Sequence, residues 1–279
     1  VGGGAGDVDG GDSRAVGGGS VPARASVARV VRRALAWALQ RAALVTGASP
    51  DLVELARALG ATRVELATVP SPAVASLLRN PRATAASRSE ARARLSETVA
   101  GVRLAPDRPL VLTVARIAPQ KDLPTLVAAA RAAEVPAEWV VVGGGDERLR
   151  ASLESELSGI PLHLVGPQRD VEDWLTAADV FVLTSRWEAR ALVVQEAMAA
   201  GLPVVVTRIG GLPDLVGDAG VLVPVGDSRA VAAAVDQLLR DDGLRQSLGE
   251  RARERARTWA SPEEEARRWV SRYTAAPTP

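Results

Sequence analysis

The stretch PLVLTVARIAPQKDLPTLVAAARAAEVPAEWVVVGGGDERL, residues 109–149, decides the fold. An apolar, largely β-branched run at 110–115 precedes a helical pattern at 122–133, and a second run at 139–143 precedes another. The same alternation continues, with apolar runs at 162–166, 179–184, 203–207 and 221–225 and helical patterns at 146–157, 170–178, 191–200 and 228–239. Strands that are apolar throughout are typical of a parallel sheet covered by helices on both faces. The sequence therefore predicts an α/β fold with a doubly wound parallel sheet.

The chain before this repeat is less regular. The first 20 residues hold nine of the 25 glycines and few large apolar side chains, so residues 1–22 are predicted to be flexible. Helical patterns follow at 26–44 and 50–59, and an apolar run follows at 63–69. The segment 80–108 is rich in Arg, Ala, Ser and Pro and is predicted to be a linker with a short helix at 88–96. A final helix is expected at about 261–274. We divide the chain into a flexible segment (1–22), an incomplete N-terminal α/β portion with linker (23–105), the doubly wound domain (106–262), and a C-terminal helix and tail (263–279).

Composition excludes several classes of function. With 34 basic and 33 acidic side chains the chain lacks the charge excess of a nucleic-acid-binding protein, and with no cysteine it has neither disulfides nor thiolate sites. The only histidine, His163, lies in an apolar run and is predicted to be structural. No apolar run approaches the roughly 20 residues of a membrane span, and no signal pattern is present. The expected location is the cytoplasm, with a peripheral position at the inner membrane face as the alternative, and the Arg-, Ala- and Gly-rich bias indicates a bacterial source.

Charged side chains follow two of the predicted strands. In open α/β sheets, ligands bind at the carboxyl ends of the strands. Arg116 and Lys121, the only lysine, follow the first strand and suit an anionic group at a helix start; the alternative is two solvated surface charges. Glu188 and Glu196 follow the fourth strand and are eight residues apart, too far along a helix to act on one bond. They suit two anchor points on an extended ligand, or only structural roles at a helix start and on a solvated helix face.

Two further patterns are similar to known ligand sites. In the turn Gly143-Gly144-Gly145-Asp146, Arg148 stands where a dinucleotide fingerprint needs its last glycine, which disfavours an NAD(P)-dependent oxidoreductase. A tight turn that gives a ligand access to the backbone is the preferred interpretation. Asp7-Val8-Asp9 is similar to an Asp-x-Asp metal clamp but lies among glycines with no strand before it, so we assign it to the flexible segment and predict no metal site.

Five segments in order resemble a known family: VARIAPQKDLPTLV, VVGGGDERL, LVGPQRDVEDWLTAADVFVLTSRWEA, VVQEAMAAGLPVVVTRIGGLPDLV and GVLVPVGD. Together, over about 110–240, they resemble the C-terminal half of a family-4 glycosyltransferase of the group 1 type, with the two-Rossmann GT-B architecture. The resemblance implies a retaining enzyme that transfers a sugar from a nucleotide-sugar donor to an acceptor. It implies no cofactor and no metal, and leaves the acceptor open among a glycan, a lipid and a small molecule. A phosphorylase of the same architecture is disfavoured because Lys121 is in the wrong loop for a Schiff base.

The resemblance also implies residue roles. Arg116 and Lys121 would neutralise the departing diphosphate, Glu188 would face the hydroxyls of the transferred sugar, and Glu196 would face the nucleotide ribose. The loop 166–171 would border the nucleobase. The implied catalytic residues are Arg116, Lys121 and Glu188, and the implied donor-binding residues are Gly144, Gln168, Val171, Ala189, Arg190, Ala191, Leu192 and Glu196.

Two departures from the family pattern matter. Where the family has Glu-Gly-Phe-Gly, this chain has Glu188-Ala189-Arg190-Ala191, which narrows the approach to the backbone and adds a cation. Only about 80 residues precede the donor domain, fewer than a full Rossmann domain. The alternative function is therefore a truncated, inactive module that binds nucleotide sugar, and self-association or a missing N-terminal segment is expected.

Overall fold

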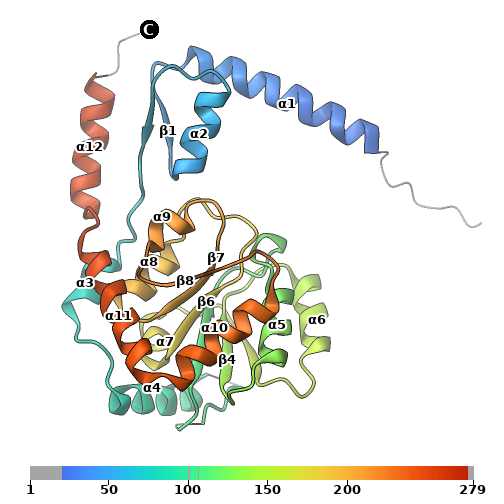
Figure 1. Cartoon of the computed structure of the whole chain (residues 1–279), viewed down its shortest axis with the longest axis vertical. Helices are drawn as coiled ribbons and strands as arrows, with labels where there is room; N and C mark the ends of the chain where they lie inside the picture. The colour runs from blue at the N-terminus through green and yellow to red at the C-terminus, as the bar shows by residue number, and fades with distance from the viewer. Residues whose placement is uncertain (1–20, 100, 106, 276–279) are drawn as a thin grey trace, which may run out of the picture.

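The computed structural model describes residues 21–99, 101–105 and 107–275. Its main body is a six-stranded sheet in which every neighbouring pair is parallel and the strand order is β5-β4-β3-β6-β7-β8 (Figure 1). The strands are β3 (Leu110–Val114), β4 (Glu138–Val142), β5 (Leu162–Gly166), β6 (Val180–Leu183), β7 (Val204–Thr207) and β8 (Val221–Val223). This order reverses between β3 and β6, as in doubly wound folds. The predicted α/β fold class is confirmed.

Helices cover both faces of the sheet because its strands are apolar on both sides. Along β3, Leu110 and Leu112 enter one buried cluster while Val111 enters the other, as the two-residue period of a strand requires. The first cluster lies under α4 (Ala85–Thr98), α7 (Glu172–Ala177), α8 (Leu192–Ala199) and α9 (Leu212–Val216). The second lies under α5 (Leu123–Ala132), α6 (Glu147–Glu156) and α10 (Ser228–Arg240), and α11 (Asp242–Arg257) contributes to both.

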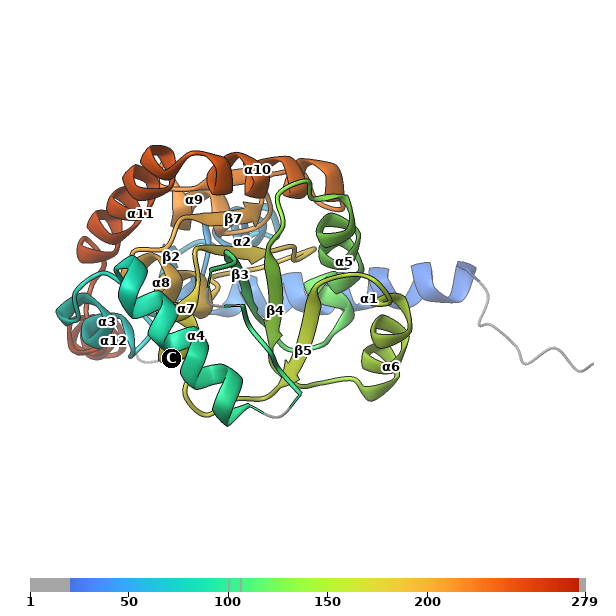
Figure 2. The ribbon, with the colours of Figure 1, turned by 90° about the horizontal axis from the view of Figure 1, so that it is seen from below.

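Helix α4 forms part of this covering layer. It is longer than the helix predicted at 88–96, because Thr84 and Ser87 form a capping box before it. Ala91 and Leu95 are buried in the first cluster, and in the view from below α4 lies across the sheet (Figure 2). The segment that reads as a linker in the sequence therefore packs on the six-stranded domain.

A smaller unit precedes α4. It contains α1 (Val21–Arg41), β1 (Val45–Gly47), α2 (Pro50–Ala58), β2 (Val64–Leu66) and α3 (Val74–Arg79). Strands β1 and β2 pair in parallel, and α1 projects away from the rest of the molecule (Figure 1). Helix α12 (Pro262–Ala275) reaches this unit, where Arg272 Nε lies 3.3 Å from Glu65 Oε2. Strand β1 and helix α3 were not predicted.

His163 and Arg253 are both held by contacts within the fold. His163 Nε2 lies 3.0 Å from Glu138 Oε2 on the neighbouring strand, which confirms its structural role. The charged stretch 250–257, whose alternating Arg and Glu predict a solvated helix face, is partly buried: Arg253 is 7% exposed and donates to the carbonyls of Leu78 and Ala199 at 2.8 and 3.2 Å. Within the described ranges no helix is long and apolar enough to cross a membrane. The Asp7-Val8-Asp9 motif and nearly all of the segment 1–22 lie outside the described residues.

Candidate active site

A cleft of about 360 Å³ opens at the carboxyl ends of β3, β4 and β6. This is the point at which the strand order reverses, where open α/β sheets bind their ligands. Its lining residues are Val114, Ala115, Arg116, Lys121, Val142, Gly143, Pro167, Gln168, Val171, Glu188, Arg190, Ala191, Leu192 and Val193. The cleft thus brings together most of the residues that the sequence selected from four separate loops.

The backbone of Lys121 is fixed by a turn in its own loop and by a hydrogen bond from the end of β6. Pro119 begins a 3₁₀ turn that ends at Lys121, and Asp122 then adopts a left-handed conformation with φ of 48° before α5 begins. The hydroxyl of Thr184, at the end of β6, donates to the carbonyl of Lys121 at 3.0 Å. The backbone of Lys121 is therefore fixed against the end of β6, and this sets the direction in which its side chain leaves the loop.

Lys121 and Glu188 form the central ion pair of the cleft. Lys121 Nζ donates to Glu188 Oε1, and the two side chains are only 13% and 9% exposed. Ser185, which is fully buried, donates its hydroxyl to the same carboxylate oxygen at 2.8 Å. An ammonium has three donors, so Lys121 can bind a ligand oxygen while it keeps Glu188. Removing either partner would leave a poorly hydrated charge without its counterion.

Arg116 differs from Lys121 in its surroundings. Its side chain is exposed and makes no hydrogen bond or ion pair with any described residue, although it lines the cleft. Arg190 is the third cation of the lining, and its guanidinium lies over the ring of Trp259, with 5.8 Å from Cζ to the ring centroid. Burial lowers the pKa of Arg190, and Asp214 opposes this effect. With Glu188 as the one carboxylate among the lining residues, the cleft is electropositive and suits an anion.

Two glycines allow the loops around the cleft to approach closely. At Gly143, with φ of 143°, a Cβ would lie 1.9 Å from the carbonyl oxygen of Ala115. At Gly210, with φ of 54°, it would lie 2.0 Å from the carbonyl oxygen of Glu188. Any side chain at these positions would push apart the β3 and β4 loops or displace the loop that carries Glu188. The predicted glycine turn after β4 is therefore required for packing between loops.

Three of the residues selected from the sequence do not line the cleft. Gly144 packs near Pro167, with 3.4 Å from the position of a Cβ to Pro167 Cδ, and Ala189 lies in the loop before α8. Glu196 lies on α8, one turn beyond the cleft wall, and its Oε1 accepts a hydrogen bond of 2.5 Å from the hydroxyl of Ser71. Burial raises the pKa of Glu196, and the Ser71 hydrogen bond partly offsets this.

The neighbouring Gln195 joins the same contact. Its side-chain oxygen accepts from the backbone N–H of Ser71 at 3.1 Å, and its amide donates to the carbonyl of Val69 at 3.1 Å. Helix α8 is thus bound to the strand-to-helix segment of the smaller unit. Glu196 was selected as an anchor for a ligand, whereas in the structure its hydrogen-bond partner comes from the chain itself.

Six residues of the cleft wall were not named as site residues, although Gly143 lies in the predicted glycine turn and Pro167 in the loop 166–171 expected to border the base. All of them end a strand or flank a selected loop residue: Val114, Ala115, Val142, Gly143, Pro167 and Val193. Their position at the carboxyl ends of β3, β4 and β5 or at the start of α8 was a sufficient signal. In the described part of the chain, the cleft included, no group of three or more His, Asp or Glu side chains is arranged to hold a metal ion.

Comparison with known proteins now identifies the family. Residues 97–255 match the family described as "Glycosyl transferases group 1", which is more than half of the chain. The chain belongs to the group 1 glycosyltransferases. It is 40% identical over 128 residues to N-acetyl-alpha-D-glucosaminyl L-malate synthase of Bacillus anthracis, which covers 43% of this chain and 33% of that protein. It is 44% identical over 102 residues to D-inositol 3-phosphate glycosyltransferase of Corynebacterium diphtheriae, covering 35% and 24%.

Solved structures show the same fold as this group 1 glycosyltransferase chain. Sucrose-phosphate synthase of Thermosynechococcus elongatus superposes with a TM-score of 0.73 and 28% identity, covering 88% of this chain and 61% of that one. HepE of Anabaena, solved with UDP-glucose, superposes with a TM-score of 0.75 at 19% identity, covering 88% and 68%. The chain therefore spans no more than about a third of the length of the two sequence relatives named above and about two thirds of these structural neighbours.

Proposed function

We propose that the chain is a retaining, family-4 glycosyltransferase that transfers a sugar from a nucleotide-sugar donor to an acceptor. The observation that carries the proposal is the electropositive cleft at the strand reversal, in which Lys121 and Glu188 are paired beside the free cation of Arg116. Such a cleft offers charge for a diphosphate and a carboxylate for hydroxyl groups at neighbouring positions. The UDP and UDP-glucose complexes of the structural neighbour HepE support this donor class.

The two cations would act on the leaving group. In the transfer, the bond between the anomeric carbon and the diphosphate oxygen breaks, and its electron pair departs with the diphosphate. An acceptor oxygen forms the new bond to the anomeric carbon on the same face, and its proton passes to the departing diphosphate. Lys121 and Arg116 would stabilise that developing charge, and preorganised charges of this kind are often the largest catalytic contribution. Lys121 is held in place by its backbone and by Glu188, so little reorganisation is needed when the charge develops. We propose that these cations take the role that a metal ion has in other transferases.

The rest of the cleft would bind the remaining parts of the donor. Glu188 would accept hydrogen bonds from sugar hydroxyls, and the α8 N-terminus at Ala191 and Leu192 would present backbone N–H groups to the diphosphate. Pro167, Gln168 and Val171 would border the base. Glu196 would require its Ser71 hydrogen bond to be shared with, or replaced by, a ribose hydroxyl.

Titration with UDP tests the role of the cations. Lys121→Ala and Arg116→Ala are each expected to weaken UDP binding by the roughly 1.5–3 kcal/mol of one charge-assisted hydrogen bond. Arg131→Ala is the matched control, because Arg131 is an exposed arginine near the far end of α5 from Lys121. Isothermal titration calorimetry on folded protein measures the change. Equal UDP affinities in the wild type and the three variants would contradict the role of the two cations. Retention is tested separately by the anomeric configuration of the product, and an inverted anomer would contradict it.

A further inference from the structure

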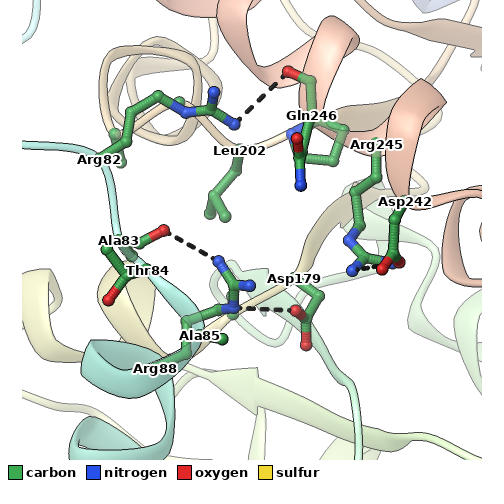
Figure 3. A pocket seen from close by; sticks show the side chains of 14 residues that line it. Arg82, Ala83, Thr84, Ala85, Arg88, Asp179, Leu202, Asp242, Arg245 and Gln246 are labelled. Atoms are coloured by element: carbon green, nitrogen blue, oxygen red, sulfur yellow. Dashed lines mark hydrogen bonds and ion pairs between the residues drawn. The ribbon is translucent and has the colours of Figure 1, made fainter.

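A second pocket, of about 420 Å³, lies at the opposite edge of the sheet. Its wall includes Ala178 and Asp179 directly before β6, and Leu202 and Pro203 directly before β7. The start of α4 and the first half of α11 close it from two other sides (Figure 3). The donor cleft lies beyond the carboxyl ends of the strands, so the two pockets are separated by the length of the sheet.

Three arginines from three segments enter this pocket. Arg82 precedes α4, Arg88 lies on α4 and Arg245 lies on α11, and their side chains come from different sides of the recess in Figure 3. They are 30%, 23% and 17% exposed, so each guanidinium is partly removed from water. Arginines that converge in a recess and are not fully solvated are the usual basis for recognition of phosphate or carboxylate groups.

The carboxylates near these arginines do not balance them. Arg82 pairs with Glu250 at 3.0 Å and Arg245 with Asp242 at 2.7 Å, but these carboxylates are 66% and 75% exposed. Pairs of this kind contribute little in water, so an anion can compete for both cations. Arg245 also donates to the carbonyl of Leu238 at 3.2 Å, and Arg82 to that of Gln246 at 3.4 Å. The one buried carboxylate of the pocket, Asp179, is 8% exposed.

Asp179 is also shared between two arginines. It lies 3.1 Å from Arg88 Nε and accepts as well from Arg92, which is buried behind the pocket wall. Burial lowers the pKa of Arg88; Asp179 opposes this, while Arg245, Arg92 and Arg82 lower it further. The guanidinium groups therefore repel one another across the recess, and a bound anion would relieve that repulsion.

The backbone around Arg82 is shaped to hold its side chain. A Cβ on Gly201, which has φ of 80°, would lie 2.8 Å from Arg82 Nε, and a Cβ on Gly249 would lie 2.8 Å from one of its terminal nitrogens. The arginine thus lies in a channel between two glycines of different elements. Next to it, Thr84 and Ala85 line the pocket at the start of the 14-residue helix α4, whose positive end favours an anion.

We propose that this pocket binds the phosphate or diphosphate group of a small molecule. Forked guanidinium groups from Arg82, Arg88 and Arg245 would contact the phosphate oxygens, and the apolar wall of Leu202 and Pro203 would contact the rest of the ligand. The volume lies within the range of small-ligand pockets. The site uses no residue of the donor cleft and does not depend on the proposed glycosyl transfer.

Binding of inorganic pyrophosphate tests the proposal if the donor cleft is disabled first. In the full chain carrying both Arg116→Ala and Lys121→Ala, calorimetry is expected to show one remaining pyrophosphate site. Arg245→Gln and Arg82→Gln in that background are each expected to weaken it about tenfold or more, as the loss of one charge-assisted hydrogen bond predicts. Arg240→Gln is the matched control, because Arg240 is an exposed arginine of α10 that pairs with Glu134 outside the pocket.

Folding of the Arg116→Ala, Lys121→Ala background is checked first by circular dichroism, because Lys121→Ala leaves Glu188 without its counterion. Arg88→Gln breaks a contact with the buried Asp179. Arg245 and Arg82 pair with exposed carboxylates, so their replacement leaves no buried charge unpaired, although it removes hydrogen bonds to the carbonyls of Leu238 and Gln246. Co-sedimentation with phosphatidylcholine vesicles that contain phosphatidic acid distinguishes the source. Arg82- and Arg245-dependent capture by vesicles without pyrophosphate binding would assign the same phosphate chemistry to a lipid headgroup. The absence of both, or pyrophosphate binding that neither variant changes, would overturn the proposal.

Discussion

Glu188 and Glu196 have different surroundings although both were selected as ligand anchors. Glu188 lies in the cleft between a lysine and a buried serine hydroxyl, and Glu196 faces Ser71 from the smaller unit. Glu188→Gln is therefore expected to leave UDP affinity unchanged or higher, because it frees Lys121, and to weaken UDP-glucose by roughly 1–3 kcal/mol. Titrating one protein with both ligands separates the two effects. Equal losses for UDP and UDP-glucose would show that Glu188 acts by positioning Lys121 and does not bind the sugar.

The role of Glu196 is tested by comparing Glu196→Ala with a variant of its hydrogen-bond partner, Ser71→Ala. If its carboxylate binds the ribose, Glu196→Ala weakens UDP and UDP-glucose alike, whereas Ser71→Ala, which removes only the intramolecular partner, leaves both affinities unchanged. If the carboxylate only joins α8 to the smaller unit, both variants lose stability and neither loses affinity. Titration and thermal unfolding of the two variants distinguish the roles.

The raised pKa of Glu196 also has a consequence for stability. Because burial favours its protonated form, the folded state holds this proton more tightly than the unfolded chain does. The favourable contribution is full below the unfolded value of about 4.3 and is lost as the pH rises through the higher folded value. Glu196→Gln cannot ionise, so its free energy of unfolding relative to wild type is expected to increase as the pH rises above about 4.3. Urea titrations at several pH values measure this; a difference that falls with pH would contradict it.

At the scale of elements, the loops that follow β3 and β4 pack directly against each other. Gly143→Ala is expected to destabilise the fold by more than the roughly 1–3 kcal/mol of an unfavourable backbone conformation, since it also places a methyl group 1.9 Å from the Ala115 carbonyl. Gly159→Ala is the matched control, because its φ is 75° and nothing lies within 4 Å of the added carbon. Urea unfolding measures the loss in the free energy of unfolding for each variant. Equal losses would show that the β3 and β4 loops can move apart at little cost.

Sequence patterns predicted the elements of the large domain well and those of the smaller unit less well. All six strands of the sheet lie in largely apolar runs, and each was placed within about two residues of its observed position. Strand β1 has three residues and depends on its partner β2, and α3 has six residues and packs on α8, so both are fixed by tertiary contacts that local pattern does not contain. The same limit applies to Arg253, whose carbonyl acceptors at Leu78 and Ala199 come from distant positions of the chain.

The site shows the same division between local and tertiary information. Arg116, Lys121 and Glu188 could be selected because the carboxyl ends of parallel strands meet at one edge. The Ser71–Glu196 hydrogen bond joins residues 125 positions apart and could not be read from either segment. The position of the Arg190 guanidinium over Trp259 was unforeseen for the same reason.

At the scale of the whole molecule, the two sides of the cleft are unequal. The large domain supplies every lining residue of the donor cleft, whereas the smaller unit pairs only two short strands. Helix α1 carries Val30, Val31 and Trp37, which are 67%, 59% and 60% exposed. Apolar side chains grouped on a projecting helix favour association between copies. We expect the 279-residue chain to self-associate, with Val31→Ser and Trp37→Ser shifting it toward the monomer in sedimentation velocity experiments.

The same asymmetry predicts how activity and binding separate. Holding donor and acceptor in reactive orientation contributes roughly 7–11 kcal/mol to a two-substrate transfer, and Arg116, Lys121 and Glu188 would hold only the donor. The 279-residue chain is therefore expected to bind UDP-glucose while transferring glucose slowly or not at all to glycan, lipid and small-molecule acceptors. Calorimetry measures the binding, and release of UDP in the presence and absence of acceptors measures turnover, with Lys121→Ala as the control for hydrolysis outside the cleft. Rapid, acceptor-dependent release of UDP by the monomer would show that the smaller unit is sufficient to hold the acceptor. The acceptor side would then be formed by β1, α2 and the start of α12.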